Sequence, residues 1–449
     1  VDVLVTGADD DGDTYLDADC SAPIAGDDCD DLDETVHPDA PEACNLVDDD
    51  CDGLTDVAAV APPVTVYDGV ALGAPAPAAN LGSHAVVWQV GSGGDASVYV
   101  RFVLEDGTLF SEPFKVDALA GSGSSAADPA IAAGAPLLSV DGEPHQFAAV
   151  WIAGAETASP AAVICGLSVD GGGGVSHDVQ ALALATGDAE QLARPAVIHD
   201  GDGSGWVAAW AAQYADATTG VTLQAKEMHA SPDAAFEIDR RAGAVEGLAL
   251  ELVGPDDYAV AFSRQDTDAD ADPEIYRSRV TLAADVWDQT GFPEPVSASS
   301  AVVADPSTDP ALAADGSGGW LTAFTDDGGN GVPDALGALA GSDPVALAQS
   351  LTTVQEVRGA AFGGGRYGVI HFAEADATRA LEFRLHDPAD LSAPPSQGGR
   401  LAAAALIADE EIADARLIAA GESTFAATWI ERDDDGERVR FVVFEGCEP

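Results

Sequence analysis

The chain has 449 residues, with 78 acidic and 18 basic side chains, a formal net charge of -60 at pH 7 and 47% hydrophobic residues. This charge would repel a phosphate backbone, which excludes nucleic-acid binding, whereas the hydrophobic fraction excludes a disordered acidic tail. No run of about 18 apolar residues occurs, so we expect no membrane-spanning helix.

The first residues, VDVLVTGADDDGD, lack the charged start and long apolar stretch of a signal peptide. We therefore expect a mature, processed form or an excised fragment of an exported protein. Export is also expected because four of the six cysteines lie in the first 56 residues, where disulfides would require an oxidising compartment.

Those four cysteines allow three pairings. Because short loops close at low entropic cost, we predict disulfides between Cys20 and Cys29 and between Cys44 and Cys51. The wide spacing disfavours a zinc site as the alternative. The remaining Cys165 and Cys447 are left unassigned.

Aspartates in the same segment follow the spacing of a calcium loop, in which positions 1, 3, 5 and 9 supply side chains and position 7 a carbonyl. No basic side chain precedes Arg101, so the charge requires a bound cation. The expected ligands are Asp9, Asp11, Asp13, the Tyr15 carbonyl and Asp17 in one loop, Asp48, Asp50, Asp52, the Leu54 carbonyl and Asp56 in the other, and Asp28, Asp30, Asp31 and Asp33 between them. A solvated acidic linker is the alternative, disfavoured by the regular spacing and the interleaved cysteines.

The runs DDDGDTYLDADC and DDCDDLDETVHPDAPEACNLVDDDCDGLTD resemble the aspartate- and cysteine-rich module of secreted proteins from myxobacteria and related bacteria. That metal-binding motif is named after a copper-binding surface protein of methanotrophs, and it is similar to the calcium repeats of thrombospondin. The resemblance covers about residues 8–56 and implies a bound metal, although Asp39 stands where the family usually has glycine. Soft ligands are scarce, with Met228 the single methionine and His37 the single histidine of the module, so we predict calcium rather than copper.

After residue 57 a repeat of short apolar segments appears, with starts 47 to 63 residues apart. The segments are HAVVW (84–88), FAAVW (147–151), WVAAW (206–210), YAVAF (258–262), WLTAF (320–324), YGVIH (367–371) and FAATW (425–429). Four antiparallel strands of this length cannot bury both faces alone, so the units must pack on each other. We predict an all-β chain, with a disulfide- and calcium-stabilised module at 1–56 and a seven-bladed β-propeller at 57–449. A string of β-sandwiches would need units of about 100 residues.

The segment PVTVYDG (63–69) stands alone before the first repeat. We expect it to supply the outer strand of the last blade and so to close the ring.

Two loops of the predicted propeller carry further acidic ligands. The loop DDGGNGVPD (326–334) resembles the calcium loops of integrin-type propellers, and DTDADADPE (266–274) is denser in aspartate. The candidate ligands are Asp326, Asn330, the Val332 carbonyl and Asp334 in the first loop, and Asp266, Asp268, Asp270 and Asp272 in the second. Solvated loops are the alternative.

No catalytic motif stands out. The arginines are scattered along the sequence rather than clustered, and we expect His371 to be a packed core residue. We therefore expect no enzyme, but a secreted calcium-binding propeller that serves as a binding, adhesion or structural surface protein for an extracellular protein or polysaccharide. The alternative is a propeller hydrolase acting on extracellular polysaccharide, which would require two carboxylates about 5 to 10 Å apart.

Overall fold

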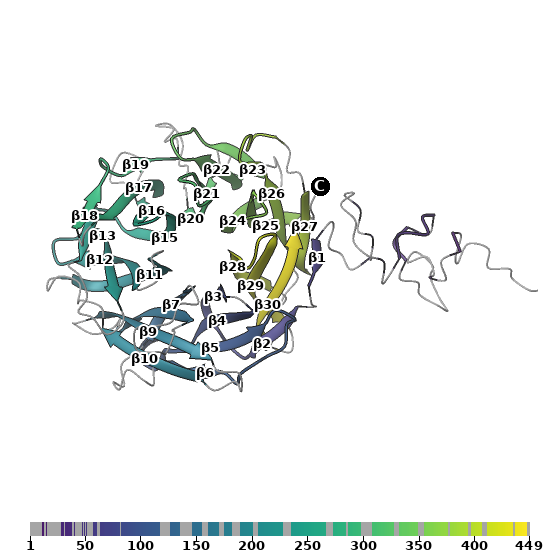
Figure 1. Cartoon of the computed structure of the whole chain (residues 1–449), viewed down its shortest axis with the longest axis horizontal. Coiled ribbons are helices and arrows are strands. Elements are labelled where there is room, and N and C mark those ends of the chain that lie inside the picture. Colours follow the sequence, from purple (N-terminus) through teal and green to yellow (C-terminus); the bar gives the residue numbers. More distant parts are fainter. Residues whose placement is uncertain are drawn as a thin grey trace, which may run out of the picture.

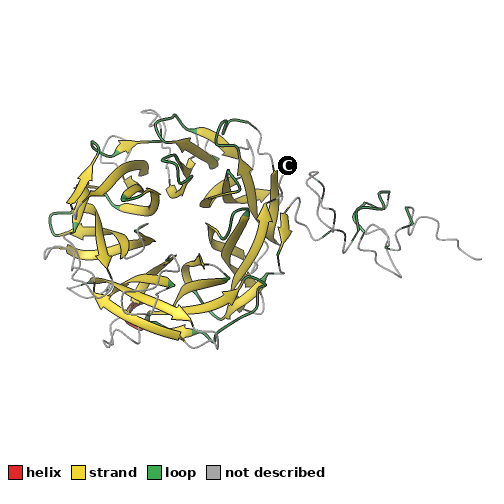
Figure 2. Cartoon of the chain, viewed as in Figure 1, coloured by secondary structure: helices red, strands yellow, loops and turns green. Residues whose placement is uncertain are grey.

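The computed structural model describes residues 11, 12, 15, 28–30, 32–37, 40, 47, 49, 51, 57–60, 63–80, 82–116, 126–134, 146–154, 160–169, 175–181, 189–200, 205–227, 235–265, 273–283, 286–297, 308–326, 332–348, 354–375, 378–393, 397–405, 411–433 and 436–446. These residues form seven antiparallel sheets arranged in a ring (Figures 1 and 2). The predictions of an all-β fold and of a seven-bladed propeller are confirmed. Among the described residues, no helix reaches the length and apolarity needed to cross a bilayer.

Each blade is an antiparallel sheet of four or five strands, and the first strand of its repeat lies nearest the centre of the ring (Figure 1). Blades one to three contain β3 (Leu72–Asn80), β4 (Ser83–Val90), β5 (Ser97–Leu104) and β6 (Phe114–Lys115); β7 (Ala126–Ala133), β8 (Phe147–Ala153), β9 (Ala161–Val169) and β10 (Val175–Ala181); and β11 (Ala189–His199), β12 (Gly205–Tyr214), β13 (Thr218–Glu227) and β14 (Phe236–Ala242). A 3-10 turn, Gly93–Asp95, connects β4 to β5.

The remaining blades repeat this order. Blades four to six contain β15 (Val245–Gly254), β16 (Asp257–Gln265), β17 (Pro273–Ala283), β18 (Val286–Gln289) and β19 (Glu294–Pro295); β20 (Thr308–Ala314), β21 (Trp320–Asp326), β22 (Asp334–Leu339) and β23 (Val345–Ala348); and β24 (Val354–Gly363), β25 (Arg366–Ala375), β26 (Thr378–His386) and β27 (Gln397–Ala405). Blade seven contains β28 (Glu411–Ala419), β29 (Thr424–Asp433) and β30 (Gly436–Gly446), completed by β1 (Val57–Ala59) and β2 (Val64–Asp68).

The second strand of each blade is an apolar run because both of its faces are covered by neighbouring blades. In β8, alternate side chains point to opposite sides, as the period of two in a strand requires. Phe147, Ala149 and Trp151 pack in a cluster with blade one, whereas Val150 and Ile152 pack in a cluster with blade three. The HAVVW-type repeats therefore mark strands buried between two blades.

The ring is closed by strands from both ends of the propeller segment. The last strand, β30, pairs with β29 on one side and with β1 and β2 on the other. In β2, Val64 lies opposite Phe441, and Val66 is fully buried in a cluster that contains Phe441 and Val443. Residues from the two ends of the propeller thus share one sheet.

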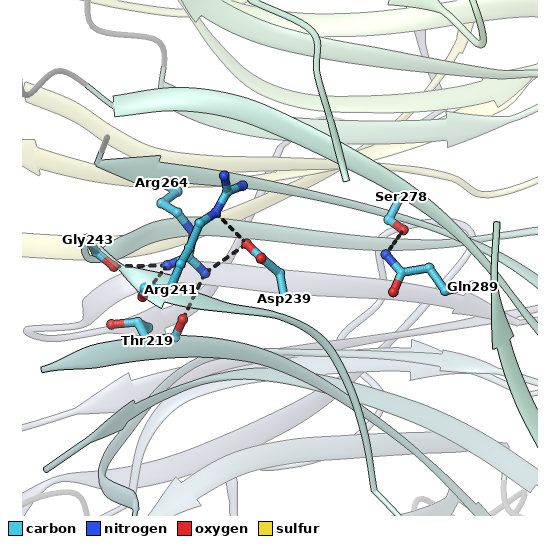
Figure 3. A network of polar contacts seen from close by, with 7 residues as sticks. All are labelled: Thr219, Asp239, Arg241, Gly243, Arg264, Ser278 and Gln289. Atoms are coloured by element: carbon cyan, nitrogen blue, oxygen red, sulfur yellow. Dashed lines mark hydrogen bonds and ion pairs between the residues drawn. The ribbon is translucent and has the colours of Figure 1, made fainter. Parts of the chain in front are cut away.

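A buried arginine connects blades three and four (Figure 3). Arg264 of β16 is 1% exposed, and its guanidinium lies 3.2 Å from the carboxylate of Asp239 in β14. The same guanidinium donates hydrogen bonds to the carbonyl oxygens of Arg241, Gly243 and Thr219, at 3.1, 3.1 and 2.9 Å (Figure 3). This arrangement satisfies carbonyl groups at the turn where the chain passes from one blade to the next.

Strand direction fixes which loops share a face of the ring. The innermost strand of a blade runs away from one face, the second strand returns, and the third runs away again, because all neighbours are antiparallel. The beginning of each innermost strand therefore lies at the same face as the connection between the second and third strands. We call this face the entry face.

Candidate functional site

The innermost strands share an irregularity near their beginning. The pairing register between first and second strands shifts at 72/76, 127/130, 193/196, 245/247, 308/311, 357/359 and 413/416. Such bulges leave extra residues out of the ladder and redirect side chains, and they are over-represented next to active sites. In this propeller they place a ring of redirected residues near the entry face.

Charged side chains occupy several of these bulges and line one cavity of about 310 Å³, which we call the mouth. Its charged lining residues are Asp128 of blade two, Arg194 of blade three, Glu246 and Glu251 of blade four, Arg358 of blade six and Arg416 of blade seven. Residues 194, 358 and 416 are far apart in the sequence, yet each lies in or directly after the bulge of its innermost strand. These three arginines, though scattered along the sequence, therefore line one cavity.

Backbone strain marks three of the same bulges. Asp128, Arg194 and Asp414 have φ values of 51°, 54° and 50°, in the left-handed region that residues other than glycine rarely adopt. Strain of this kind costs about 1 to 3 kcal/mol per residue and clusters at functional sites. Blade one has Gly73, with φ 70°, at the corresponding position. Glycine adopts this conformation without strain, so the bulge does not require a charged residue.

The three arginines of the mouth differ in their partners. Arg358 donates to the Glu356 carboxylate at 2.7 Å and lies 5.0 Å from the centre of the Phe372 ring, which restricts its position. Arg416 donates to the carbonyl oxygen of Ala415 at 3.0 Å. Arg194 is exposed, and no hydrogen bond or ion pair of its side chain occurs within the described part of the chain.

Below the mouth, the channel continues as a cavity of about 340 Å³ walled mostly by alanine, valine, leucine, isoleucine and proline. Glu251 is the one ionisable group among the residues lining this cavity. The apolar wall around it raises the pKa of its carboxyl group to about 7, although a hydrogen bond from the backbone N–H of Leu252 acts in the opposite direction. The side chain touches the channel space and is only partly exposed, so it is desolvated while remaining within reach of a small molecule.

In the N-terminal module the structure corrects the predicted disulfides. Cys29 is bonded to Cys51, with an S–S distance of 2.07 Å and 22 residues of separation. Both predicted pairings, Cys20 with Cys29 and Cys44 with Cys51, are therefore wrong. The entropic cost of loop closure grows only slowly with length, by about 1 kcal/mol between loops of these sizes, so short loops are a weak guide to pairing. In the propeller, Cys165 is buried as a free thiol.

Around this disulfide the described residues form a compact arrangement. Asp28 and Asp49 are 1% and 3% exposed, and the backbone N–H of His37 donates to the Asp49 carbonyl at 2.9 Å. The Asp30 N–H donates to the Asp28 carboxylate at 2.9 Å. Buried carboxylates are costly unless compensated, and this segment contains no basic residue before Arg101. Hard oxygen donors of this kind suit a divalent cation, and metal binding by these two residues stays a prediction.

Asp11, Tyr15, Asp28, Asp30 and Asp33 are the predicted ligands of this module that belong to the described part. Within that part, no three histidine, cysteine, aspartate or glutamate side chains are close enough to hold a metal ion. The other predicted module residues lie outside the described residues: Asp9, Asp13, Asp17, Asp31, Asp48, Asp50, Asp52, Leu54, Asp56, Cys20 and Cys44.

One predicted metal loop of the propeller is partly described. Asp326, at the end of β21, lies directly opposite Asp334, at the start of β22, and the two are 4% and 1% exposed. Like charges directly opposite each other on neighbouring strands are destabilising, and metal binding by this pair stays a prediction. Val332 also lies in the described part, whereas Asn330 and all four blade-four candidates, Asp266, Asp268, Asp270 and Asp272, lie outside it.

Sequence reasoning missed the mouth residues altogether. Asp128, Arg194, Glu246, Arg358 and Arg416 belong to no contiguous motif, because each comes from a different blade. A signal was nevertheless available: each stands about 9 to 19 residues before the aromatic start of its own blade repeat. Comparing this stretch among the seven repeats would have shown that it carries charged residues in blades two, three, four, six and seven.

A family model, Cu-binding_MopE, described as "Putative metal-binding motif", matches residues 28–56. The resemblance of the module to this family is therefore confirmed over that segment, which includes both partners of the disulfide. No curated protein sequence matches the chain significantly.

Solved structures of other propellers resemble the chain in fold. An ulvan lyase bound to -[GlcA(1-4)Rha3S]- superposes with a TM-score of 0.52 at 8% identity, covering 86% of this chain and 96% of that chain. The α-L-arabinanase of Penicillium chrysogenum gives a TM-score of 0.44 at 11% identity, covering 71% and 93%. A Hadza microbial sialidase gives a TM-score of 0.44 at 12% identity, covering 85% and 68%. At 8% identity the likeness to the ulvan lyase extends to the fold alone.

The sequence-based expectation that the chain is not an enzyme is contradicted by this comparison. The ulvan lyase is an enzyme whose chain shares the propeller fold over nearly its whole length. The expectation was based on the absence of a contiguous catalytic motif, and a propeller site assembled from separate blades needs no such motif. The chain thus combines a metal-binding motif of the Cu-binding MopE family, at residues 28–56, with a seven-bladed β-propeller.

Proposed function

We propose that this protein is a hydrolase that acts on extracellular polysaccharide, with its active site at the mouth of the propeller channel. The observation that carries the proposal is the charged, strained ring of bulge residues around an otherwise apolar channel. Charged residues are not needed to form a bulge, as Gly73 in blade one illustrates, and three of them occur at backbone conformations that cost stability.

The chemistry of the lining favours hydrolysis. Glycoside hydrolases need two carboxyl groups, one to protonate the leaving oxygen and one to act as base or nucleophile. Asp128 of blade two and Glu246 of blade four are both exposed and lie in blades on either side of Arg194. Glu251 is five residues further along β15 than Glu246, about 16 Å deeper at the rise of a strand, so these two cannot act on one glycosidic bond.

The ulvan lyase supports the choice of substrate class by analogy of fold, because it acts on a polysaccharide and shares the propeller architecture. Lyase chemistry is the less favoured reaction for this chain. The described lining of the mouth contains no histidine, tyrosine or lysine that could remove a sugar ring proton, whereas it does contain carboxylates.

The proposal is tested by release of reducing ends from a panel of neutral and acidic polysaccharides. We expect the full chain to cleave at least one of them, and Glu246→Gln or Asp128→Asn to lower the rate at least about 100-fold, since removing a general acid or base typically costs a factor of 100 to 10,000. The mutant proteins should keep the melting temperature of the wild type or exceed it.

Glu422→Gln serves as the matched control, because Glu422 is exposed at the turn between β28 and β29, on the face opposite the mouth. It should leave the rate unchanged. Full activity in both mouth variants would place the active site elsewhere, and products with an unsaturated sugar ring would replace hydrolysis by elimination.

For the N-terminal module we propose calcium as the metal and an extracellular location for the protein. The module contains hard carboxylate donors and almost no soft ligands, which favours calcium over copper. The Cys29–Cys51 disulfide fits an oxidising exterior, where calcium is also abundant.

Calorimetric titration of the chelator-treated full chain distinguishes the metals. We expect calcium uptake with a dissociation constant in the millimolar range or tighter, and the double variant Asp28→Asn/Asp49→Asn should bind fewer ions because both carboxylates are buried beside the disulfide. The double control Asp288→Asn/Asp343→Asn removes the same charge from the propeller and should keep the stoichiometry. Stoichiometric copper uptake without calcium uptake would contradict the assignment.

A further inference from the structure

We infer that the mouth recognises an acidic sugar unit and that Arg194 is the direct partner of its carboxylate or sulfate group. This inference rests on the proposed function for the site and names the class of glycan that the site takes. Nothing in the fold itself requires an arginine at this position.

Arg194 differs from most arginines of this strongly acidic protein in the contacts of its side chain. Acidic side chains outnumber basic ones by 78 to 18, and most of the other arginines contact carboxylates or carbonyl groups in the described structure. Arg194, exposed at the mouth, makes no such contact with the described residues. A guanidinium without an acidic partner in the described part of the chain is suited to an anion that arrives from outside.

Two carboxylate residues of the mouth, Asp128 and Glu246, belong to the blades on either side of Arg194. Asp128 and Glu246 line the same cavity from the adjacent blades, yet neither forms an ion pair with Arg194 in the described structure. Arg194 stands at φ 54° and is followed by Pro195, whose ring restricts the backbone further. Arg194 therefore belongs to the blade between those of the two carboxylates and is paired with neither of them in the described structure.

Two further arginines line the mouth on the side of the ring opposite Arg194. Arg358 and Arg416 belong to blades six and seven, whereas Arg194 belongs to blade three, so a glycan strand lying across the mouth meets arginines on both sides. Arg358 is held by Glu356 and lies against the Phe372 ring, so the position of its guanidinium is restricted. The guanidinium fork matches the two oxygens of a carboxylate or sulfate.

Local charge also permits an anion here. The three arginines balance the three carboxyl groups of the lining, Asp128, Glu246 and Glu251, in a protein whose net charge is -60. Arg358 is also paired with Glu356, so the lining is not shown to be neutral, but it is less acidic than the chain as a whole. At an ionic strength of 0.15 M the Debye length is about 8 Å, so distant carboxylates repel a bound anion only weakly.

The test measures the affinity of the full chain at 0.15 M sodium chloride for three hexasaccharides: an oligogalacturonate, its carboxyl-reduced neutral counterpart, and a sulfated galactan. Calorimetry at 4 °C keeps turnover slow. We expect the galacturonate or the sulfated hexasaccharide to bind at least about tenfold more tightly than the neutral one, the effect of one charge-assisted contact. Whichever acidic probe binds more tightly identifies the anion as carboxylate or sulfate.

Arg194→Gln should remove this preference, and Arg194→Lys, which keeps the charge without the fork, should retain part of it. The matched control is Arg400→Gln, because Arg400 is exposed on the outer strand β27 and lies 4.0 Å from Glu382. Equal affinity of wild type for acidic and neutral probes, or an unchanged preference in Arg194→Gln, overturns the inference.

The outcomes separate this inference from the proposed function. Cleavage of a neutral glycan without discrimination between the probes would leave hydrolysis standing and reject acidic recognition. Tight binding of an acidic probe, dependent on Arg194 but never followed by cleavage of an acidic polysaccharide, would support recognition and reject hydrolysis.

Discussion

Deleting residues 57–70 from the propeller lowers its free energy of unfolding by at least about 5 kcal/mol, whereas deleting residues 1–56 leaves it nearly unchanged. Deletion of residues 57–70 removes β1 and β2, the two strands that pair with the outer edge of β30. It also removes Val66, which is fully buried, and the partly buried Val64 and Tyr67 that pack in the same cluster. Each such side chain contributes about 1.5 to 3 kcal/mol on burial, in addition to the lost ladder hydrogen bonds.

Urea denaturation of the chains 57–449 and 71–449, followed by tryptophan fluorescence, measures the difference. The exposed edge of β30 should also make the shorter chain prone to association, which size-exclusion chromatography would detect. Equal urea midpoints for the two chains would show that closure of the ring does not depend on the strands of residues 57–70.

Replacing Arg264 by methionine lowers the free energy of unfolding by about 3 to 5 kcal/mol, the cost of breaking a buried ion pair by removing one partner. Methionine fills most of the volume, so the loss reports the polar network of Figure 3 rather than a cavity. Without the guanidinium, Asp239 retains only Arg241, and the carbonyl groups of Thr219 and Gly243 lose their buried donor.

Arg240→Gln is the matched control for this prediction. Arg240 lies on the same strand as Asp239 but is exposed, with an ion pair to Asp216 at 3.0 Å and a contact with the Tyr214 ring. Exposed pairs of this kind are worth at most about 1 kcal/mol. A loss in Arg264→Met no larger than that in Arg240→Gln would mean that the network contributes little to the junction of blades three and four.

The propeller could be predicted from the sequence because the second strand of each blade is buried on both faces and is therefore a contiguous apolar run. Segments such as FAAVW and WVAAW are apolar at every position, since alternate side chains pack on the preceding and following blades. A strand with one solvated face would have alternated, and the regular spacing of seven apolar runs was enough to predict the ring.

The disulfide of the module could not be predicted from spacing. Loop-closure entropy separates the candidate pairings by only about 1 kcal/mol, less than the packing around Val36 and the buried Asp28 and Asp49 can contribute. The partner of Cys29 is therefore decided by how the whole segment folds, and the observed partner is Cys51.

The mouth could not be predicted because its residues become neighbours only through the ring. Asp128, Arg194 and Glu246 are separated by more than 50 residues each, and each reaches the cavity through a bulge that no propensity reveals. The raised pKa of Glu251 likewise depends on walls supplied by the other blades. A functional site of this kind forms only when the ring closes, because different blades supply its residues.

The most direct test of glycan binding at the mouth is to locate the glycan in a crystal structure of the protein soaked with hexagalacturonate. We predict density across the mouth, with an acidic group within hydrogen-bonding distance of the Arg194 guanidinium and a glycosidic oxygen near Glu246 or Asp128. Density confined to the outer strands of the blades, or to the face opposite the mouth, would contradict the assignment of this site.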